Sequence, residues 1–311
     1  MKHPAVAVFL AACLATAACP VFARMPPVPG AGHHQTPVSR GVDRASMQTM
    51  QIASHGALMN ALVYVAAGAG PHPAVILLHG FPGNERNLDL AQDMRRVGWD
   101  VLYFNYRGSW GTPGDFSFAH GIEDTAAAIA YLRQPDVARS LRLDPNRIVL
   151  IGHSMGGFMT VEAAAADPAI EAFATISAAD LSGRMQAMLG KEQRPEAVTA
   201  MAKGLADEGM APLAGCTPKG LANELAGHVA SWPFMGKVDA LKSRTALVVT
   251  SDDGLAQENN AFAAALRKAG DRHVTTVHLP TDHAYSDQRI ALSRAVLHWL
   301  ATLPKEGKTA P

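Results

Sequence analysis

A serine flanked by two glycines stands where a strand-like run gives way to a helix-like one. Residues 152–156 read GHSMG and fit the G-x-S-x-G pattern of a nucleophile elbow. The apolar residues 148–151 before it predict a buried strand, and the small, helix-prone residues 155–166 after it predict a helix. Such a turn holds the serine at a strained backbone angle and lifts its hydroxyl clear of the sheet. The spacing therefore indicates Ser154 as a nucleophile for acyl transfer.

An acyl-transfer serine needs a base that takes its proton and a carboxylate that orients the base. For this type of elbow the expected chain order is serine, acid and histidine. Among the 13 histidines, His283 alone sits in the loop after the last predicted strand, on the sheet edge where Ser154 is expected. Asp253 is the preferred acid because it falls three residues past the end of the preceding predicted strand. Asp252, which better suits a helix cap or solvent, and Asp180, which follows an earlier strand, stay as alternatives.

The tetrahedral intermediate of acyl transfer needs backbone N–H donors aimed at its oxyanion. We expect two such donors, Met155 directly after the serine and Phe81 in the loop after the first buried strand. Gly80 would let that loop fold close to the serine. We assign His79 a structural hydrogen bond within the loop rather than a catalytic role, and expect Arg107 to support the same rim of the sheet.

Strand-like and helix-like segments alternate along most of the chain. The pattern predicts a hairpin from residues 47–53 and 58–65, buried strands at 74–78, 100–106, 147–153, 172–177, 245–250 and 274–279, and helices at 87–97, 122–133, 155–166, 256–268 and 286–300. This alternation indicates an α/β fold with a mostly parallel central sheet flanked by helices. In such sheets ligands bind at the carboxyl ends of the strands.

A long insertion interrupts this alternation. Roughly 65 residues separate two of the buried strands, far more than one crossover helix requires. We therefore assign residues 47–180 and 243–302 to the α/β core and residues 181–242 to a helical cap insertion, with a tail at 303–311. Short helices are expected there, broken at Gly190, Pro195, Gly204, Pro212, Gly215, Pro218 and Pro233. For each of its methionines, Met185, Met188, Met201, Met210 and Met235, we favour a core position over a pocket lining.

The composition limits the partners that the chain is expected to have. Its 311 residues are 48% hydrophobic, enough for one large domain or a domain with an insertion. The 27 lysines and arginines equal the 27 aspartates and glutamates, so the formal net charge is zero. That balance gives no electrostatic reason to expect a nucleic acid or an anionic membrane surface as partner. A small-molecule ester or a short peptide is the expected substrate.

The N-terminus has the pattern of an export signal. Residues 1–23 combine a weakly basic start, a small apolar run and small residues before Ala23, which predicts a signal peptide cleaved near that position and a secreted or periplasmic protein. The apolar run is shorter than the ~20 residues that a spanning helix needs, so no stable membrane insertion is expected. Residues 10–13 also resemble a lipoprotein box, which leaves lipid anchoring as a minor alternative. Residues 24–46 are expected to form a disordered lead-in.

Five short motifs resemble those of the α/β-hydrolase superfamily when taken in order: HGFPG, NYRG, GHSMGG, DDG and DHAYSD. The resemblance covers about residues 47–300, and NYRGSWGTPG and the sequence around His283 are most similar to the esterase-like and prolyl-oligopeptidase-like serine hydrolases, a group that includes dienelactone hydrolases. It implies the α/β-hydrolase fold, a Ser-Asp-His triad and no cofactor. Phe81 stands where the peptidases commonly have a tyrosine, and Ser154 stands where dienelactone hydrolases typically use cysteine. Both departures favour an esterase.

The leading functional hypothesis is therefore a serine hydrolase that cleaves carboxylic esters through an acyl-enzyme on Ser154, with His283 activating the water that releases it. Two alternatives remain at this point. One is an exopeptidase or amidase of the prolyl-oligopeptidase-like group, and the other is a catalytically inactive relative that binds a ligand. No metal is expected, because the sequence has no H-E-x-x-H, no C-x-x-C and no compact cluster of ligands.

Overall fold

The computed structural model describes residues 43–304. By its internal contacts the chain divides into residues 1–35 and 36–311, and everything described below belongs to the second unit. The predicted signal peptide, most of the predicted lead-in and most of the predicted tail lie outside the described residues. No helix within residues 43–304 is both long and apolar enough to cross a membrane.

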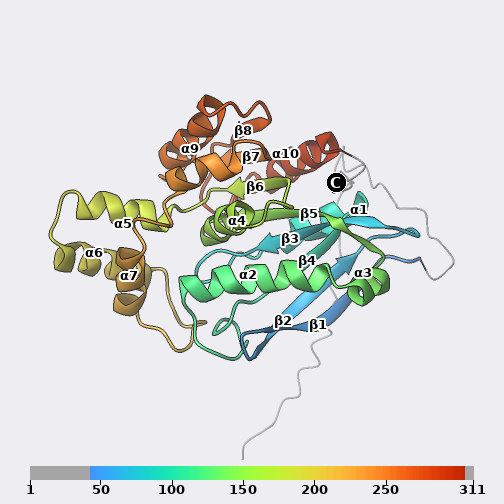
Figure 1. Cartoon of the computed structure of the whole chain (residues 1–311), viewed down its shortest axis with the longest axis horizontal. Helices are drawn as coiled ribbons and strands as arrows, with labels where there is room; N and C mark the ends of the chain where they lie inside the picture. The colour runs from blue at the N-terminus through green and yellow to red at the C-terminus, as the bar shows by residue number, and fades with distance from the viewer. Residues whose placement is uncertain (1–42, 305–311) are drawn as a thin grey trace, which may run out of the picture. The chain divides into compact units, whose positions relative to one another are not determined.

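One sheet of eight strands runs through this unit in the order β1-β2-β4-β3-β5-β6-β7-β8 (Figure 1). Strands β1 and β2 pair in an antiparallel hairpin, β2 also runs antiparallel to β4, and the remaining neighbours are parallel. The strands are β1 Ser46–Ser54, β2 Ala57–Val65, β3 His72–Leu78, β4 Asp100–Phe104, β5 Leu143–His153, β6 Ala172–Ile176, β7 Thr245–Thr250 and β8 Val274–His278. The predicted hairpin and mostly parallel sheet are thus confirmed.

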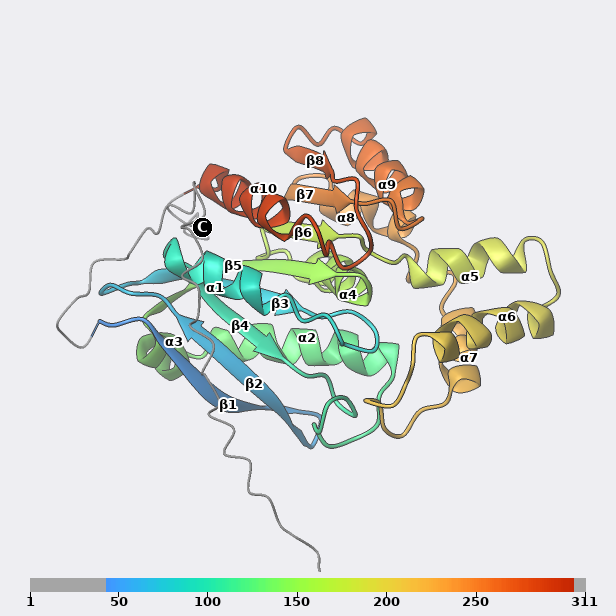
Figure 2. The ribbon, with the colours of Figure 1, turned by 180° about the vertical axis from the view of Figure 1, so that it is seen from behind.

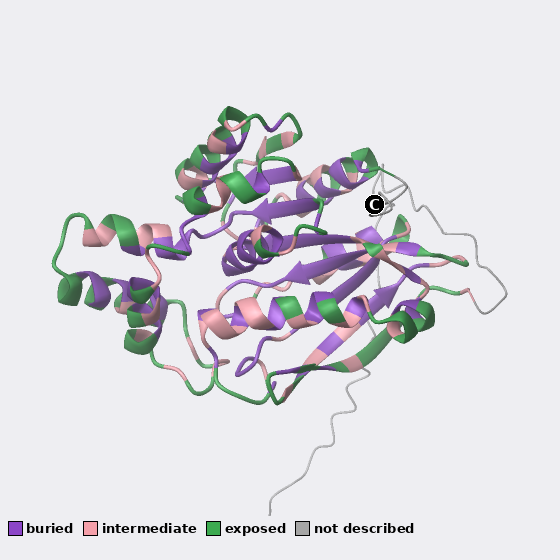
Figure 3. Cartoon of the chain, in the orientation of Figure 1, coloured by how far each residue is buried: buried purple, intermediate pink, exposed green. Residues whose placement is uncertain are grey.

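Helices cover both faces of the sheet, as the alternating pattern predicts. Helices α2 Phe118–Leu132, α3 Pro135–Leu141, α4 Met155–Ala166 and α9 Ala256–Lys268 bury their apolar sides in one core cluster. Helices α1 Leu88–Arg96 and α10 Arg289–Thr302 pack into a second cluster on the opposite face (Figure 2). Strands β4, β6 and most of β3 and β7 are buried on both sides, because helices cover them above and below (Figure 3).

Two helices differ from the prediction. Helix α2 begins at Phe118, four residues earlier than expected, because the Ser117 side chain accepts a hydrogen bond from the His120 N–H and caps the helix there. Helix α3 was not predicted, since its seven residues are too few to show a helical period. It begins with Pro135 in its first turn, a position where the missing N–H of proline costs nothing.

Between β6 and β7 the chain forms short helices, as expected for residues 181–242. These are α5 Leu181–Leu189, α6 Arg194–Asp207, α7 Pro218–Gly227, the 3₁₀ turn η1 Phe234–Lys237 and α8 Val238–Leu241. The predicted break at Gly204 is wrong, because α6 continues through it. Packing of Val198, Met201 and Leu205 on one buried face outweighs the cost of about 1 kcal/mol that a glycine brings to a helix interior.

Backbone and side-chain contacts fasten this insertion to the core. The Glu224 carboxylate of α7 accepts the N–H groups of Phe118 and Ala119, at 3.0 and 2.9 Å, and so caps the start of α2. The segment before α7 pairs with the loop after β4, where the Trp110 N–H donates to the Pro212 carbonyl at 2.9 Å. Among the insertion's methionines, Met185 and Met201 are buried in the core cluster, Met188 and Met210 pack against it partly buried, and Met235 is exposed.

Candidate active site

Ser154 occupies a sharp turn between β5 and α4. Its backbone angles are φ 56° and ψ −121°, a left-handed conformation that a side chain other than glycine rarely adopts. A Cβ added at Gly152 would lie 1.9 Å from the Gly156 carbonyl oxygen, and one added at Gly156 would lie 2.0 Å from that of Leu78. The two glycines are therefore required for the turn to close, which is the physical basis of the sequence pattern.

Asp253 and His283 come together although 30 residues separate them in the chain. The His283 Nδ1 lies 2.7 Å from Asp253 Oδ2, and the Asp253 side chain is 3% exposed against 42% for His283. Burial alone would raise the pKa of Asp253, but hydrogen bonds from His283, the Leu255 N–H and the Ser177 hydroxyl outweigh it and hold the pKa well below its usual value. The carboxylate thus stays charged and accepts a hydrogen bond from the Nδ1–H group, so that Nε2 is the nitrogen left to accept a proton.

His153 connects this pair to the serine. Its Nε2 donates to the carbonyl oxygen of His283 at 2.8 Å, and the two imidazole rings lie 4.7 Å apart. Burial, and the positive charge that His283 carries when protonated, lower the pKa of His153 to about 3, so this ring stays neutral. Within residues 43–304, no hydrogen bond joins the Ser154 hydroxyl directly to His283. The structure therefore links the two predicted residues through the backbone neighbour of the serine.

The two alternative acids lie elsewhere. Asp252 is 65% exposed and faces His278 Nε2 at 3.2 Å, on the outside of the last strand. Asp180 accepts the N–H of Gly183 at 2.9 Å and caps the start of α5. Burial raises the pKa of Asp180 to about 6. Neither carboxylate bonds to His283 in the part of the chain that the structure describes, so geometry favours the same acid as the sequence does.

The loop after β3 passes directly over the serine. A Cβ added at Gly80 would lie 2.9 Å from Ser154 Cβ and 3.4 Å from its hydroxyl oxygen. Among the described residues no acceptor pairs with the N–H of Phe81, the next residue in this loop. Met155 is the first residue of α4, where the N–H has no partner within the helix and the helix dipole attracts negative charge. Both predicted oxyanion donors therefore belong to segments that adjoin Ser154.

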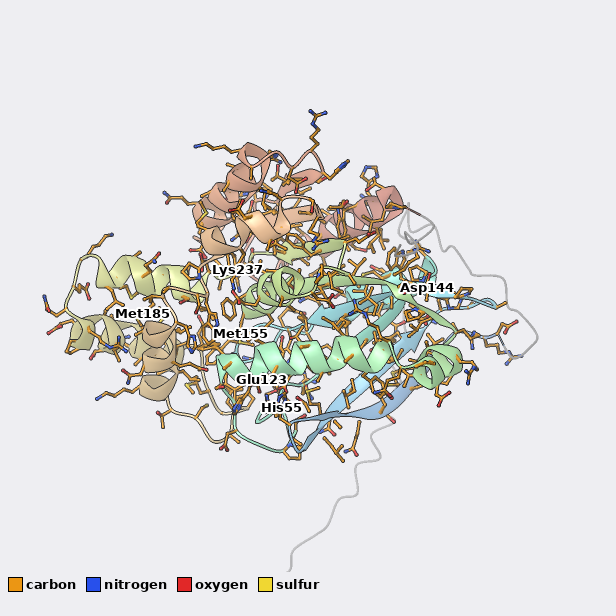
Figure 4. All side chains as sticks on the ribbon, viewed as in Figure 1. His55, Glu123, Asp144, Met155, Met185 and Lys237 are labelled. Atoms are coloured by element: carbon orange, nitrogen blue, oxygen red, sulfur yellow. The ribbon has the colours of Figure 1, made fainter. Side chains whose placement is uncertain are left out.

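Two polar residues support this rim from below. His79 is fully buried, its Nδ1 donates to the Gly80 carbonyl at 2.8 Å, and burial lowers its pKa to about 4, so it forms the structural hydrogen bond predicted for it. Arg107 is buried rather than solvated and donates through Nε to Asp124 at 2.6 Å. It also pairs with Glu123, which faces His55 at 3.7 Å (Figure 4). These contacts fix the loops after β3 and β4 from the core side.

Sequence reasoning missed a cluster of buried hydroxyl groups beneath Asp253. Ser177 Oγ lies 2.8 Å from the Tyr285 hydroxyl and 3.0 Å from Ser251 Oγ, and all three residues are fully buried. Ser251 and Tyr285 each lie two residues from a predicted catalytic residue, which is the signal that could have pointed to them. Ser177 follows β6, and nothing in the sequence indicates that this strand end contributes to the site.

Comparison with known proteins identifies the family. Residues 75–295 match the model of the alpha/beta hydrolase family, so the chain belongs to that family. It is 33% identical over 124 residues to the quorum-quenching protein AidA of Acinetobacter baumannii, a match covering 38% of this chain and 39% of AidA. It is 35% identical over 107 residues to an uncharacterized protein of Mycobacterium tuberculosis, covering 34% of this chain and 35% of that protein. The matched stretches thus span well under half of these relatives.

Solved structures share the fold at low sequence identity. A thermostable carboxyl esterase from Bacillus coagulans superimposes with a TM-score of 0.62 at 16% identity, covering 82% of this chain and 98% of that one. An esterase from Pyrococcus furiosus gives 0.61 at 14% identity, covering 83% and 91%. An esterase from Pyrobaculum calidifontis gives 0.60 at 22% identity, covering 82% and 85%. These likenesses establish the alpha/beta hydrolase fold.

Proposed function

We propose that this chain is a serine hydrolase of carboxylic esters, with Ser154 as nucleophile, His283 as base and Asp253 as the orienting acid. The observation that carries the proposal is the 2.7 Å hydrogen bond between the buried Asp253 carboxylate and His283 Nδ1, on the sheet edge where Ser154 is held in a strained turn. A carboxylate in this position fixes the tautomer of the imidazole and stabilises the imidazolium that forms during acyl transfer.

In the first half of the proposed reaction, His283 Nε2 takes the proton of the Ser154 hydroxyl while Oγ bonds to the ester carbonyl carbon. The carbonyl oxygen gains the negative charge and accepts hydrogen bonds from the N–H groups of Phe81 and Met155. The bond from the carbonyl carbon to the alkoxy oxygen then breaks. The alkoxy oxygen takes the proton from the imidazolium and leaves as the alcohol, and the acyl group stays on Ser154.

In the second half, a water molecule replaces the alcohol. His283 takes a proton from the water while the water oxygen bonds to the acyl carbon. The N–H groups of Phe81 and Met155 again donate hydrogen bonds to the oxyanion. Collapse of this intermediate breaks the bond to Ser154 Oγ, which recovers its proton from the imidazolium and releases the carboxylic acid. Hydrogen bonds between serine and histidine are often long in enzymes without substrate, so the proposed bond would form on substrate binding.

The inserted helices are the proposed determinant of substrate choice. Helix α5 begins at Leu181, five residues after β6 ends, and Asp180, which caps it, also accepts the Phe234 N–H at 3.1 Å. The insertion is therefore anchored next to the strand ends that carry the proposed triad. We propose that it caps the acyl site. Several of the solved structures that share the fold are esterases, which favours an ester over an amide as the bond cleaved.

Turnover of p-nitrophenyl esters from acetate to dodecanoate tests this function, with aminoacyl p-nitroanilides assayed in parallel. We expect ester hydrolysis, little anilide hydrolysis, and a loss of about 10⁵-fold or more in kcat for Ser154→Ala, since triad members act as one unit. A folded protein that hydrolyses neither class and is not labelled by a fluorophosphonate would instead be a ligand-binding relative. Faster turnover of the anilides would favour the peptidase alternative.

We also propose export, on the pattern of residues 1–23 alone. Expression of the full chain in a Gram-negative host, followed by N-terminal sequencing of the periplasmic protein, tests it. A mature chain starting at Arg24 is expected, whereas an uncleaved cytoplasmic protein contradicts the proposal. A lipid-modified Cys13 in the membrane fraction would support the lipoprotein alternative.

A further inference from the structure

We propose that Ser177 and Tyr285 are positioning residues that hold Asp253 and His283 in register through a buried hydroxyl network. This inference rests on the proposed function, because it concerns the acid and base of the same reaction. It assigns roles to two residues that touch neither the substrate nor the nucleophile, and that come from the loops after β6 and β8.

The network is compact and closed to solvent. Ser177 Oγ lies 2.8 Å from the Tyr285 hydroxyl and 3.0 Å from Ser251 Oγ, and each of the three residues has 0% of its surface exposed. A buried hydroxyl group without a hydrogen-bond partner destabilises the fold. These three hydroxyl groups therefore depend on the hydrogen bonds that they make to each other. Ser177 is the common member, because it contacts both of the others.

The donors and acceptors of the network lead to the acid. A serine hydroxyl has one proton and two lone pairs, so Ser177 can donate to the Asp253 carboxylate while it accepts from Tyr285 and Ser251. The hydrogen bond from Ser177 contributes to the lowered pKa of Asp253. Burial, as the largest influence, raises the pKa of Tyr285 to about 12, so its hydroxyl keeps its proton and remains available as a donor. Each bond in the chain strengthens the next one.

The backbone at both ends of the network is unusual. Ser177 has φ 43° and Tyr285 has φ 58°, both in the left-handed region that residues other than glycine rarely occupy. The Ser177 N–H donates to the Val249 carbonyl of β7 at 2.8 Å, which ties the loop after β6 to the next strand. Strained positions of this kind persist only where the surrounding contacts over-determine them, and they gather at functional sites.

The network therefore joins three strand ends. Ser177 follows β6, Asp253 and Ser251 follow β7, and Tyr285 lies two residues after His283 in the loop that follows β8. A shift of the loop after β7 or of the loop after β8 would strain these hydrogen bonds, because Ser251 belongs to the first loop and Tyr285 to the second. The hydroxyl groups therefore have two effects. They position the imidazole of His283, and they partly neutralise the negative charge of the Asp253 carboxylate that faces it.

Removing single hydroxyl groups tests the inference. Tyr285→Phe keeps the ring and loses the hydroxyl that bonds to Ser177 and Ser251, and Ser177→Ala loses the donor to Asp253. With fewer donors the carboxylate is less neutralised and attracts the imidazolium more strongly, so the acid limb of the pH profile of kcat/KM should move to higher pH. We expect kcat to fall about threefold in Tyr285→Phe and about tenfold in Ser177→Ala, with KM little changed, because positioning and not binding is lost.

Three measurements separate this effect from a general loss of structure. The first is the pH profile of kcat/KM, whose acid limb should move to higher pH. The second is the NMR resonance of the His283 Nδ1–H proton, which is identified by its absence in His283→Gln and should move when the hydrogen bond to Asp253 changes. The third is thermal unfolding. Tyr103→Phe is the matched control, because it removes a buried tyrosine hydroxyl that bonds to Asn105 at 2.9 Å, outside the network.

The NMR resonance of the His283 Nδ1–H proton keeps this inference separate from the proposed function. A wild-type protein that hydrolyses no ester would refute the function, yet a displaced Nδ1–H resonance in both variants would still support the network. An active wild type whose Tyr285→Phe and Ser177→Ala variants keep the wild-type kcat, acid limb and Nδ1–H resonance would overturn the inference alone. Loss of activity in the variants with an unmoved Nδ1–H resonance would also overturn it, because a structural defect would then explain the result.

Discussion

The loops at the carboxyl ends of β5 to β8 and the inserted helices adjoin each other but are built in different ways. Ser154, Ser177 and Tyr285 in the loops have positive φ values between 43° and 58°. Within residues 181–242 only Gly209 and Gly215 have a positive φ, so every other residue there is free of such strain. Strained backbone is costly and is kept where side chains must meet in one geometry. The contrast fits the proposal that the loops carry out the chemistry and that the insertion determines specificity.

The contacts of the two regions follow the same division. The loops are joined to each other by buried hydrogen bonds, such as the one between Asp253 and His283 at 2.7 Å. The insertion shares an apolar cluster with the core, and polar contacts also join the two. Glu224 caps α2, and Lys237, labelled in Figure 4, pairs with Glu162 at 2.7 Å. Substitutions in the loops should therefore lower kcat, whereas substitutions in the insertion should change KM or stability. The predictions below test that separation.

The largest effect is expected for Asp253→Asn, which keeps the shape of the acid but removes its charge. The amide cannot stabilise the imidazolium and favours the wrong imidazole tautomer, so kcat should fall by about 10⁴-fold with an unchanged fold. Asp252→Asn is the matched control, since that neighbouring carboxylate is 65% exposed and lies apart from His283. The rates of ester hydrolysis by the two variants show which aspartate is the acid of the proposed triad. A larger loss in the Asp252 variant would mean that the wrong aspartate has been chosen.

A smaller effect is expected for Gly80→Ala. The added methyl group would lie 2.9 Å from Ser154 Cβ and 3.3 Å from the His153 carbonyl oxygen, so the loop after β3 must move away. That movement would displace the N–H of Phe81, and one oxyanion donor is worth about 2.7 to 4 kcal/mol, which sets an upper bound near 10³-fold on the loss in kcat. Gly204→Ala in α6 is the control, because nothing lies within 4 Å of its added Cβ. Equal kcat values for both variants would contradict the proposed oxyanion hole.

The sequence predicted what depends on local pattern and missed what depends on contact at a distance. The elbow around Ser154 was predictable because Gly152 and Gly156 relieve clashes within one turn. His283 was predictable because parallel strands end on one edge, so its place after β8 indicated its side of the sheet. The partnership of Ser177 with Tyr285 spans 108 residues and rests on side-chain packing, for which no periodicity exists. The contact between the insertion and α2 could not be predicted from the sequence for the same reason.

The insertion side of the comparison is tested by Glu224→Gln. The change removes the charge that accepts the Phe118 and Ala119 N–H groups at the start of α2. We expect a loss of about 1 to 2 kcal/mol in unfolding free energy, since hydrogen bonds to a charged group at a helix N-terminus are worth about this much. KM should rise a few-fold for long acyl chains while kcat stays within about twofold. A large loss in kcat with KM unchanged would show that the two regions are not separable.

The smallest effect on catalysis is expected at the contact between η1 and α4, where the change is one of stability. Burial raises the pKa of Glu162 to about 7, although the hydrogen bond from Lys237 opposes it. The unfolded chain releases this proton near the ordinary value of 4.5, so between about pH 4.5 and 7 the folded state binds more protons and stability falls as pH rises. Glu162→Gln cannot titrate and should lack this part of the slope, a difference of about 3 kcal/mol across the range. Chemical denaturation at pH 5 and pH 7.5 measures this difference in unfolding free energy, with Glu192→Gln at an exposed position as control.

A wild-type slope in the Glu162 variant would mean that the carboxyl group titrates normally. A changed kcat would mean that this contact influences the proposed triad.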